Sequence, residues 1–409
     1  MKHYKIVVVG SGISSYFFLL GLDRKLYKKT CVLVGNSYPE KIYKQTANTN
    51  FLLNNKFGGF ALNWLGGFSE FHKKELKFIK NSFCLRLLKT HKLFNEYYNK
   101  IYEDYLNLKK PNLNNIKSSK LLRISKNKTL LENTDVLRVK KLKNLKYINS
   151  SLKNIEKKKS KIILTLDKKN NFISCDKLIL AAGTISTAGI ISKMLNLNKV
   201  YFKHQLYFLG FVFFPFKSFK FQKFKFSTRS YFDKKGKFKG TLEFNSKFIQ
   251  EKLFKSSILN NNKFLYYLLN LILNKFIFFN AFVNSKYCDA LIIKKKKIFE
   301  IKSLIKKETT RKFSILIRSN LKELFNFNFK NIKLLILFKR KIGFDKHYYG
   351  IFFNKKNKRL KLNYKSEIEG HRNIFICDQS AINVDTAKFL TYLSIANSFS
   401  VGKIISKIH

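Results

Sequence analysis

The sequence predicts an α/β fold: a doubly wound, Rossmann-like domain joined to a second domain built on an antiparallel sheet (α+β). A β-branched run, a glycine turn, an apolar helix and a second apolar run open the chain, as in a βαβ unit. Alternating aromatic and basic stretches fill 201–364, a pattern that favours antiparallel strands with one face in solvent. A last apolar run at 373–377 and a closing helix from Phe389 to about Ile408 follow.

The N-terminal residues have the pattern of a strand, a helix and a second strand. Residues Lys5 to Val9 form a β-branched run, which indicates a strand buried on both faces. After the glycines at 10 and 12, Ser14 to Leu22 is expected to form an apolar helix, and Cys31 to Val34 a second buried strand. The spacing suits a βαβ unit.

The remaining elements divide the chain into three segments. Residues 1–205 are expected to form most of the first domain, with a lysine-rich helical insertion near 73–145. Residues 206–364 are expected to form the second domain, and 365–409 to return to the first. Short strands separated by polar turns are expected at 161–166, 172–175 and 177–180.

The charge of the chain allows two interpretations. The 409 residues include 82 Lys and Arg against 24 Asp and Glu, a formal charge of +58, yet 45% hydrophobic residues exclude low-hydrophobicity disorder. A selected polyanion partner is one interpretation. The other is compositional drift, because lysine greatly outnumbers arginine and is spread along the whole chain, whereas phosphate-binding surfaces concentrate charge and favour arginine. We expect no specific nucleic-acid partner.

Cysteine usage and hydropathy predict a cytoplasmic protein. Five scattered cysteines without a C-x-x-C argue against a disulfide framework or a zinc site. The apolar N-terminus is interrupted by glycines and serines, so we do not interpret it as a signal peptide. Phe264 to Val283 carries two asparagines and a lysine, which favours a core or interfacial helix over a membrane span. Peripheral membrane contact stays open.

The first chemical motif is Gly10-Ser11-Gly12-Ile13-Ser14-Ser15, between the first strand and helix. Gly10 would make the tight turn, Gly12 would let the backbone approach a pyrophosphate, and the small Ser15 fits the third position of the motif. The pattern predicts dinucleotide binding. The acidic ribose partner expected after the second strand is missing; Asn36 stands near its place, and Glu40 is the alternative.

A second motif surrounds the only tryptophan. Paired glycines flank the segment, with an asparagine and the tryptophan between them, which suits a loop folded against a flat ligand; a surface Ω-loop is the alternative. The candidate cofactor-binding residues here are Gly58, Gly59, Asn63, Trp64, Gly66 and Gly67.

Two further strands end in candidate binding residues. Lys177 to Leu180 runs into the small residues Ala182 and Gly183, which would allow close approach of a cofactor. The run 373–377 is followed directly by Asp378 and Gln379, near the start of the final helical region.

Taken in order, the four segments resemble the glucose–methanol–choline (GMC) oxidoreductase family, particularly bacterial members associated with surface-polysaccharide synthesis. The resemblance implies a non-covalently bound FAD and oxidation of a CH–OH group of a sugar, polyol or similar alcohol by hydride transfer to flavin N5. It also implies that Asp378 bonds the pyrophosphate or ribityl region. The electron acceptor that reoxidises the flavin is not indicated. NAD is disfavoured by the missing acidic residue.

The same resemblance implies that His347 is the catalytic base. It lies in an H-x-x-G pattern before the last strand, and imidazole has a pKa suited to accepting an alcohol proton near neutrality. His371 is the rival. The Asn or His usually found in the final helical region is absent, and Lys388 could bond the substrate oxygen instead. A catalytically degenerate flavin-binding or polyanion-binding protein on this scaffold is the alternative.

Overall fold

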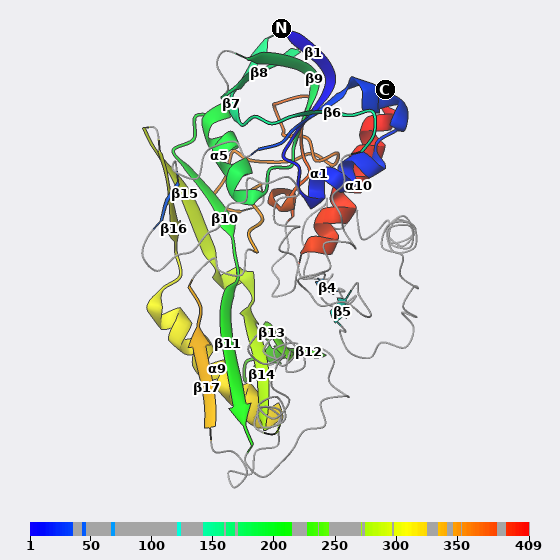
Figure 1. Ribbon diagram of the computed structural model, residues 1–409. Helices are drawn as coiled ribbons and strands as arrows, with labels where there is room; N and C mark the ends of the chain where they lie inside the picture. Colours follow the sequence, from blue (N-terminus) through cyan, green and yellow to red (C-terminus); the bar gives the residue numbers. More distant parts are fainter. Residues whose placement is uncertain are drawn as a thin grey trace, which may run out of the picture.

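A computed structural model of the chain confirms the predicted fold class (Figure 1). The structure describes a large part of the sequence: residues 1–35, 43–45, 67–69, 121–123, 142–158, 161–167, 171–214, 227–235, 237–244, 271, 275–296, 298–324, 334–341, 347–352, 354–382 and 390–408. Most of the predicted insertion at 73–145, the aromatic stretch 219–226 and the segment 264–270 lie outside these residues.

A seven-stranded sheet forms the first part of the molecule. Its order is β6-β2-β1-β9-β8-β7, with β18 also paired to β9. The strands β1, β2, β6, β9 and β18 pair in parallel, and β7 and β8 are antiparallel. The strand bounds are β1 (Lys2–Val9), β2 (Thr30–Leu33), β6 (Lys146–Ile148), β7 (Leu152–Lys158), β8 (Lys161–Leu166), β9 (Phe172–Leu180) and β18 (Ile374–Ile376).

Helices cover both faces of this sheet, as its composition requires. On β1, Ile6 and Val8 pack under α1 (Ile13–Gly21) and α10 (Thr391–Lys407), while Val7 and Val9 pack on the other face with α5 (Thr184–Met194). All four side chains are fully buried. The short helix η1 (Arg24–Lys29) leads from α1 into β2. The predicted βαβ unit is therefore confirmed.

Antiparallel sheets form the second part; in Figure 1 the strands β11 to β14 and β17 lie below the first part, and β10, β15 and β16 lie at its left. A five-stranded sheet has the order β12-β13-β14-β11-β17, and a four-stranded sheet the order β10-β15-β16-β3. Their bounds are β3 (Tyr43–Gln45), β10 (Lys199–Lys203), β11 (Leu206–Phe213), β12 (Ser227–Phe232), β13 (Phe238–Phe244), β14 (Phe276–Val283), β15 (Asp289–Lys295), β16 (Ile298–Ser303) and β17 (Leu334–Lys339). The remaining elements are β4 (Gly67–Ser69), β5 (Leu121–Arg123), η8 (Ser285–Tyr287), α9 (Lys307–Leu324) and η9 (Gln379–Ala381).

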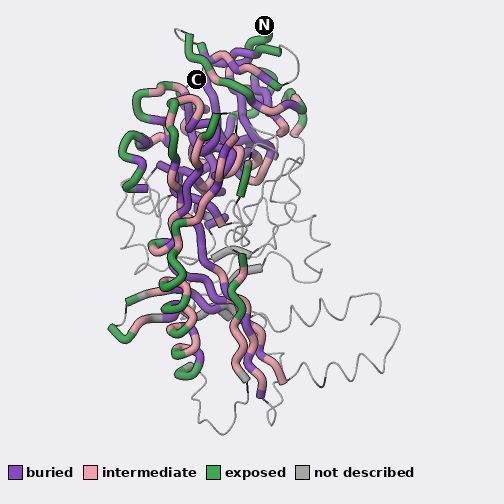
Figure 2. Tube along the Cα trace, turned by 90° about the vertical axis from the view of Figure 1, so that its left-hand side faces the viewer, coloured by how far each residue is buried: buried purple, intermediate pink, exposed green. Residues whose placement is uncertain are grey.

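Three local expectations need correction. The C-terminal part of the helix expected over Phe264–Val283 is instead strand β14, the centre of a sheet. The two strands expected at 172–175 and 177–180 are one strand, β9, which continues through Asp176; the Asp176 carboxylate lies 3.3 Å from His3 Nε2. The amphipathic helix α9 was not expected. Figure 2 shows that buried residues concentrate in the upper, seven-stranded part.

Among the described residues, no helix is long and apolar enough to cross a bilayer.

Candidate active site

The carboxyl ends of three parallel strands meet at one edge of the seven-stranded sheet. Val9 of β1 and Ile376 of β18 are both level with Leu180 of β9. Ala181 N donates to Val9 O at 2.9 Å, and Cys377 N donates to Leu180 O at 2.9 Å. The segments predicted to carry chemistry after each strand are therefore brought together, as the general rule for ligand sites in parallel sheets requires.

Gly10 makes the turn that follows β1. Its φ is +103°, and a Cβ added there would lie 2.5 Å from Ala181 O, so no larger residue fits. Ser15 Oγ donates to Gly10 O at 2.6 Å, which fixes the turn against the first helical turn. Ser15, predicted as the small third residue of the motif, thus stabilises the turn from inside the protein.

Two helices begin at this edge. α1 begins after Gly12 and α5 after Gly183, and a glycine has no side chain with which to cap the first N–H groups. Neither helix has an acidic residue in its first turn. A Cβ added at Gly183 would meet nothing within 4 Å, so space remains in front of α5. Two positive dipole ends and this space fit an anionic pyrophosphate.

Asp378 joins the loops that surround this space. Its carboxylate is 3% exposed; Oδ2 accepts from Gly183 N at 2.9 Å and Thr187 Oγ1 at 2.5 Å, and Oδ1 accepts from the N and Oγ of Ser380. Burial raises the pKa of Asp378, while these bonds act in the opposite direction. These four donors use the hydrogen-bonding capacity of the Asp378 carboxylate within the protein. Asp378 therefore holds the loops in place, and its predicted bond to a cofactor stays a prediction.

The segment that contains His347 is fastened to the same edge. Thr184 Oγ1 donates to Tyr348 O at 2.5 Å, and Gly350 N donates to Gln379 O at 3.2 Å. On its other side, the segment pairs with the end of β10 through Tyr349 and Lys203, whose N–H groups donate to each other's carbonyl oxygens at 2.9 and 2.7 Å. These bonds place half-buried His347 beside the predicted cofactor loops.

His371, the rival base, lies at the opposite edge of the sheet. It precedes β18, whose amino end points away from Asp378. Burial and the charge of Lys157 lower the pKa of His371. The topology therefore favours His347 over His371.

Comparisons with known proteins identify the fold. No family model and no curated protein matches the sequence. Two solved structures are similar over essentially the full length. Pyridoxine 4-oxidase from Mesorbium loti has 10% identity and a TM-score of 0.61, covering 99% of this chain and 100% of that chain. Formate oxidase has 9% identity and a TM-score of 0.58, covering 100% of this chain and 99% of that chain. The chain has the GMC oxidoreductase fold. The polysaccharide-associated branch gains no support from them.

Several predicted site residues lie outside the described part of this GMC fold: Asn36, Gly58, Gly59, Asn63, Trp64, Gly66 and Lys388. Gly67 begins strand β4, which pairs with β5 and lies next to α10. The roles of these residues stay predictions.

Three residues with side-chain hydroxyl groups make contacts at the site that the sequence did not predict. Thr184, Thr187 and Ser380 connect Gly183, Asp378 and the His347 segment. Thr184 and Ser380 lie shortly after predicted strand ends, but Thr187 lies inside α5, and the partners lie up to 191 positions away in the sequence. Sequence spacing alone gave no indication of those contacts.

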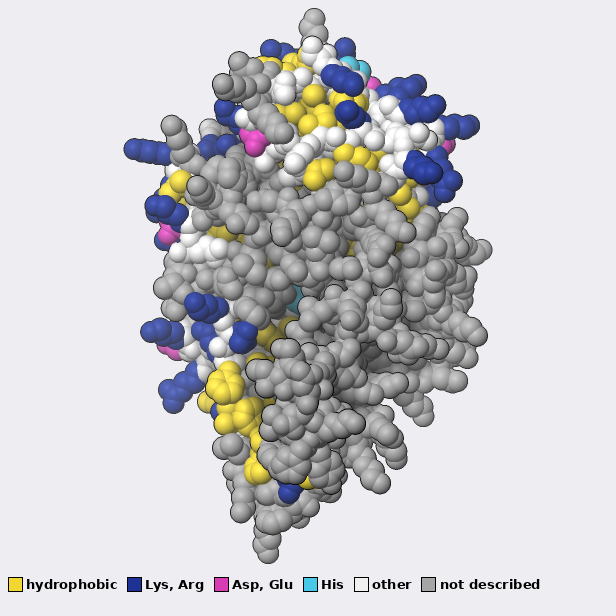
Figure 3. Space-filling view, viewed as in Figure 1, with side chains coloured by type: hydrophobic (Ala, Val, Ile, Leu, Met, Phe, Trp, Pro, Cys, Tyr) yellow, Lys and Arg dark blue, Asp and Glu magenta, His cyan; other side chains and the backbone are white. Residues whose placement is uncertain are grey.

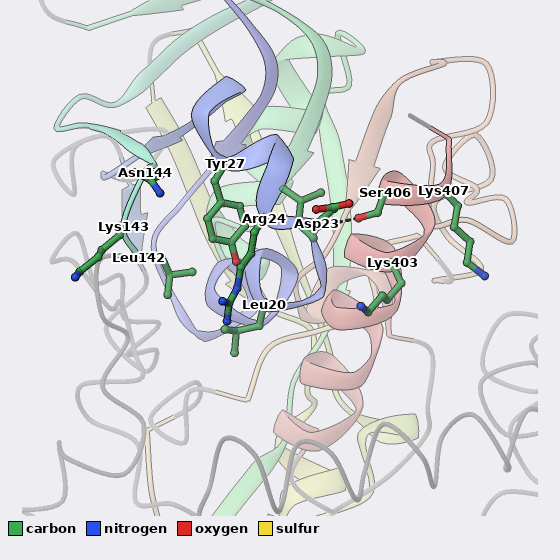
Figure 4. Close-up of a pocket in the computed structure, with 11 residues that line it drawn as sticks. Leu20, Asp23, Arg24, Tyr27, Leu142, Lys143, Asn144, Lys403, Ser406 and Lys407 are labelled. Atoms are coloured by element: carbon green, nitrogen blue, oxygen red, sulfur yellow. Dashed lines mark hydrogen bonds between the residues drawn. The ribbon is translucent and has the colours of Figure 1, made fainter.

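A separate hollow of about 810 Å³ lies at the far end of α1, next to the C-terminal end of α10 (Figure 4). Asp23 N donates to Ser406 Oγ at 2.8 Å on one wall. Arg24 and Lys403 flank the hollow, whereas the side chains of Lys143 and Lys407 extend away from it. Because α1 starts at Ile13 beside the cofactor loops and ends here, this hollow is not part of the site at the strand ends.

Proposed function

We propose that the chain binds FAD non-covalently at the edge formed by the Gly10 turn, Gly183 and the Gln379 loop, and that it oxidises an alcohol. One observation carries the proposal: hydrogen bonds hold the cofactor-type loops and the His347 segment together at one edge of the sheet. The two similar structures are named as oxidases, which supports the same class of reaction.

The described residues suit such a cofactor. The N–H groups that begin α1, after Gly10, Ser11 and Gly12, would hold the pyrophosphate, and those that begin α5 offer a second positive dipole end. Ala182 and Gly183 are small enough for close approach of the cofactor. When bound, FAD would supply the two-electron acceptor for a hydride.

His347 would remove the hydroxyl proton. A ring nitrogen of a neutral imidazole accepts that proton as the carbinol carbon loses a hydride, so the alcohol becomes a carbonyl compound with one proton and one hydride accounted for. Thr184 and Gln379 hold the backbone of the His347 segment during this step. Lys388 would donate to the substrate oxygen.

A charge placed in the Gly12 turn tests FAD binding. Gly12→Glu should abolish flavin binding because its carboxylate would repel a pyrophosphate, and Gly12→Ala, which adds only a methyl group where the backbone approaches the pyrophosphate, should weaken binding less. Asn171→Glu, exposed at the opposite edge, is the matched control for charge. The measurement is the visible absorbance of each purified protein after incubation with FAD. Wild-type protein that takes up no FAD contradicts the proposal.

A further inference from the structure

His347 is contacted by both parts of the molecule. Its backbone is tied to the first part, because Thr184 Oγ1 donates to the carbonyl oxygen of the next residue, Tyr348. Its ring meets the second part: the rings of Phe282 and His347 lie edge-on, with centroids 6.0 Å apart and an interplanar angle of 68°. Phe282 belongs to β14, which ends at Val283, at the end of the five-stranded sheet nearer the seven-stranded sheet (Figure 1). The backbone and the ring of His347 therefore have contacts in different sheets.

The ring of Phe282 is fixed by its own neighbours. Phe282 is buried, with 5% of its surface exposed. Its ring stacks on that of Tyr207, with centroids 5.1 Å apart and an interplanar angle of 22°. Tyr207 is held in turn, because its Oη donates to Asn280 Oδ1 at 2.6 Å. A buried ring that is stacked on a hydrogen-bonded ring has little freedom to turn.

The backbone of Phe282 is fixed as well. It pairs with Tyr207 of β11 on one side and with Thr241 of β13 on the other. Its carbonyl oxygen also accepts a hydrogen bond from Tyr231 Oη at 3.2 Å. A Cβ added at Gly240 would lie 2.2 Å from the same oxygen, so β13 approaches this point closely only because residue 240 is a glycine. Phe282 is thus a rigid support on the second part of the molecule.

A general base needs a fixed ring as well as a fixed backbone. His347 is half-buried, and backbone hydrogen bonds leave the two side-chain torsions of a histidine undetermined. Proton transfer requires a ring nitrogen within about 2.6–3.2 Å of the donor oxygen. A displacement of about 1 Å can lower the rate 100-fold. Edge-on contact with an immobile ring restricts both torsions, and this geometry is one that aromatic pairs prefer.

We propose that Phe282 is a positioning residue, whose ring holds the imidazole of His347 in the orientation that accepts the hydroxyl proton. This inference rests on the proposed function. In the step itself, the substrate O–H bond breaks and its proton goes to a ring nitrogen of His347, while the carbinol carbon loses a hydride to the bound FAD and the alcohol becomes a carbonyl compound. Phe282 exchanges neither a proton nor an electron. If Phe282 only packed the sheet, its effects would not depend on His347.

Matched variants provide the first test. Flavin-loaded enzyme is reduced anaerobically with whichever of glycerol, xylitol, glucose, butan-1-ol and benzyl alcohol reduces the wild type fastest. Phe282→Leu should lower kcat about tenfold and change KM by less than about twofold, whereas Phe282→Tyr, which keeps the ring, should recover most of the rate. Phe278→Leu is the control, because Phe278 lies on the same strand about 13 Å farther from His347, and kcat should change by less than about twofold. A leucine variant with normal kcat, or a tyrosine variant no better than leucine, overturns the inference.

A double-mutant cycle separates positioning from packing. A residue that acts only through the ring of His347 has nothing to position once that ring is removed. In the His347→Ala background, Phe282→Leu should therefore change the residual rate of flavin reduction by less than about twofold. A further tenfold loss in that background would show that Phe282 acts on the substrate or on the fold, and the inference would be wrong.

A spectroscopic measurement tests the contact without turnover. The chain has seven histidines, and in protein with ¹³C-labelled histidine the ring signal that His347→Gln removes belongs to His347. Because a phenyl ring shifts the signals of nuclei beside it, Phe282→Leu should move the His347 signal more than any other histidine signal, and Phe278→Leu should leave it in place. An unmoved His347 signal overturns the inference and leaves the proposed function standing. A wild-type chain that takes up no FAD contradicts the proposed function, whatever this spectrum shows.

Discussion

Thr184 places the candidate base relative to the cofactor loops. Its hydroxyl follows Gly183, at the start of α5, and donates to the carbonyl of Tyr348, the residue directly after His347. Thr184 is 4% exposed, so water cannot readily replace this bond. We interpret Thr184 as a positioning residue, which acts through the backbone of the His347 segment.

Removing this hydroxyl should slow the reaction without releasing the cofactor. Thr184→Val keeps the shape of the side chain but leaves Tyr348 O without its donor, and we expect kcat to fall about 10- to 100-fold with FAD content unchanged. Thr184→Ser restores a hydroxyl and should recover most of the rate. The measurements are kcat, KM and flavin content. A valine variant with normal kcat, or a serine variant no better than valine, would remove this role.

At the scale of elements, α1 and α10 cross at two glycines. A Cβ added at Gly21 would lie 2.3 Å from Phe399 O, and one added at Gly402 would lie 2.3 Å from Phe18 O. The two backbones therefore touch. This contact sets the position of α1, whose first turn faces the cofactor loops.

Gly402→Ala should separate the two helices. Overpacking of this kind typically costs about 1–3 kcal/mol, so the free energy of unfolding should fall by that amount. Lys407→Ala, an exposed substitution on the same helix, should change it by less than about 0.5 kcal/mol. Urea titration followed by circular dichroism measures both. Equal stability of the Gly402→Ala variant and wild type would contradict the close packing.

The elements also show which features the sequence could predict. The βαβ unit was predictable because β1 ends in a β-branched run, Ile6 to Val9, and glycines mark its end. Strand β14 was not predictable, because phenylalanines lie on both of its faces. Its sequence therefore lacks the polar–apolar alternation that distinguishes a half-exposed strand from a buried helix. The partners of Asp378 were also unpredictable, since they depend on pairing between strands far apart in sequence.

At the scale of the whole molecule, lysines are spread along the entire sequence. On the face drawn in Figure 3, the Lys and Arg side chains of the described residues are spread apart and not gathered in one patch. This distribution favours the compositional interpretation of the +58 charge over a selected polyanion partner. Acidic residues are few, so individual carboxylates with several lysine partners matter for stability. Asp289 is one of them.

Asp289 joins strands from the two predicted domains. Its Oδ1 lies 3.1 Å from Lys203 Nζ, and its Oδ2 lies 3.0 Å from Lys356 Nζ. Burial alone would raise the pKa of Asp289, but the two lysines outweigh it and the pKa lies below its ordinary value. A lowered folded-state pKa means that the stabilisation is present above the unfolded pKa of about 3.9 and is lost as pH falls through the folded value.

Asp289→Asn should therefore destabilise the protein in a pH-dependent way. At pH near 7 the free energy of unfolding should fall by about 1.5–3 kcal/mol, the usual range for hydrogen bonds to charged groups. The difference from wild type should shrink below about pH 4, where the wild-type carboxylate also becomes protonated. Asp176→Asn, at an exposed His3 pair, is the control with an expected effect below about 1 kcal/mol. A difference that is the same at both pH values would contradict this account.

We propose that the cofactor loops and a catalytic histidine, His347, share one edge of the sheet. The most direct test is anaerobic bleaching of the flavin absorbance when a panel of sugars, polyols and other alcohols is added to the FAD-loaded protein, compared with a His347→Ala variant. We predict that the wild type bleaches and that the variant, with the same flavin content, bleaches at least about 100-fold more slowly. A variant that bleaches at the wild-type rate would contradict the claim.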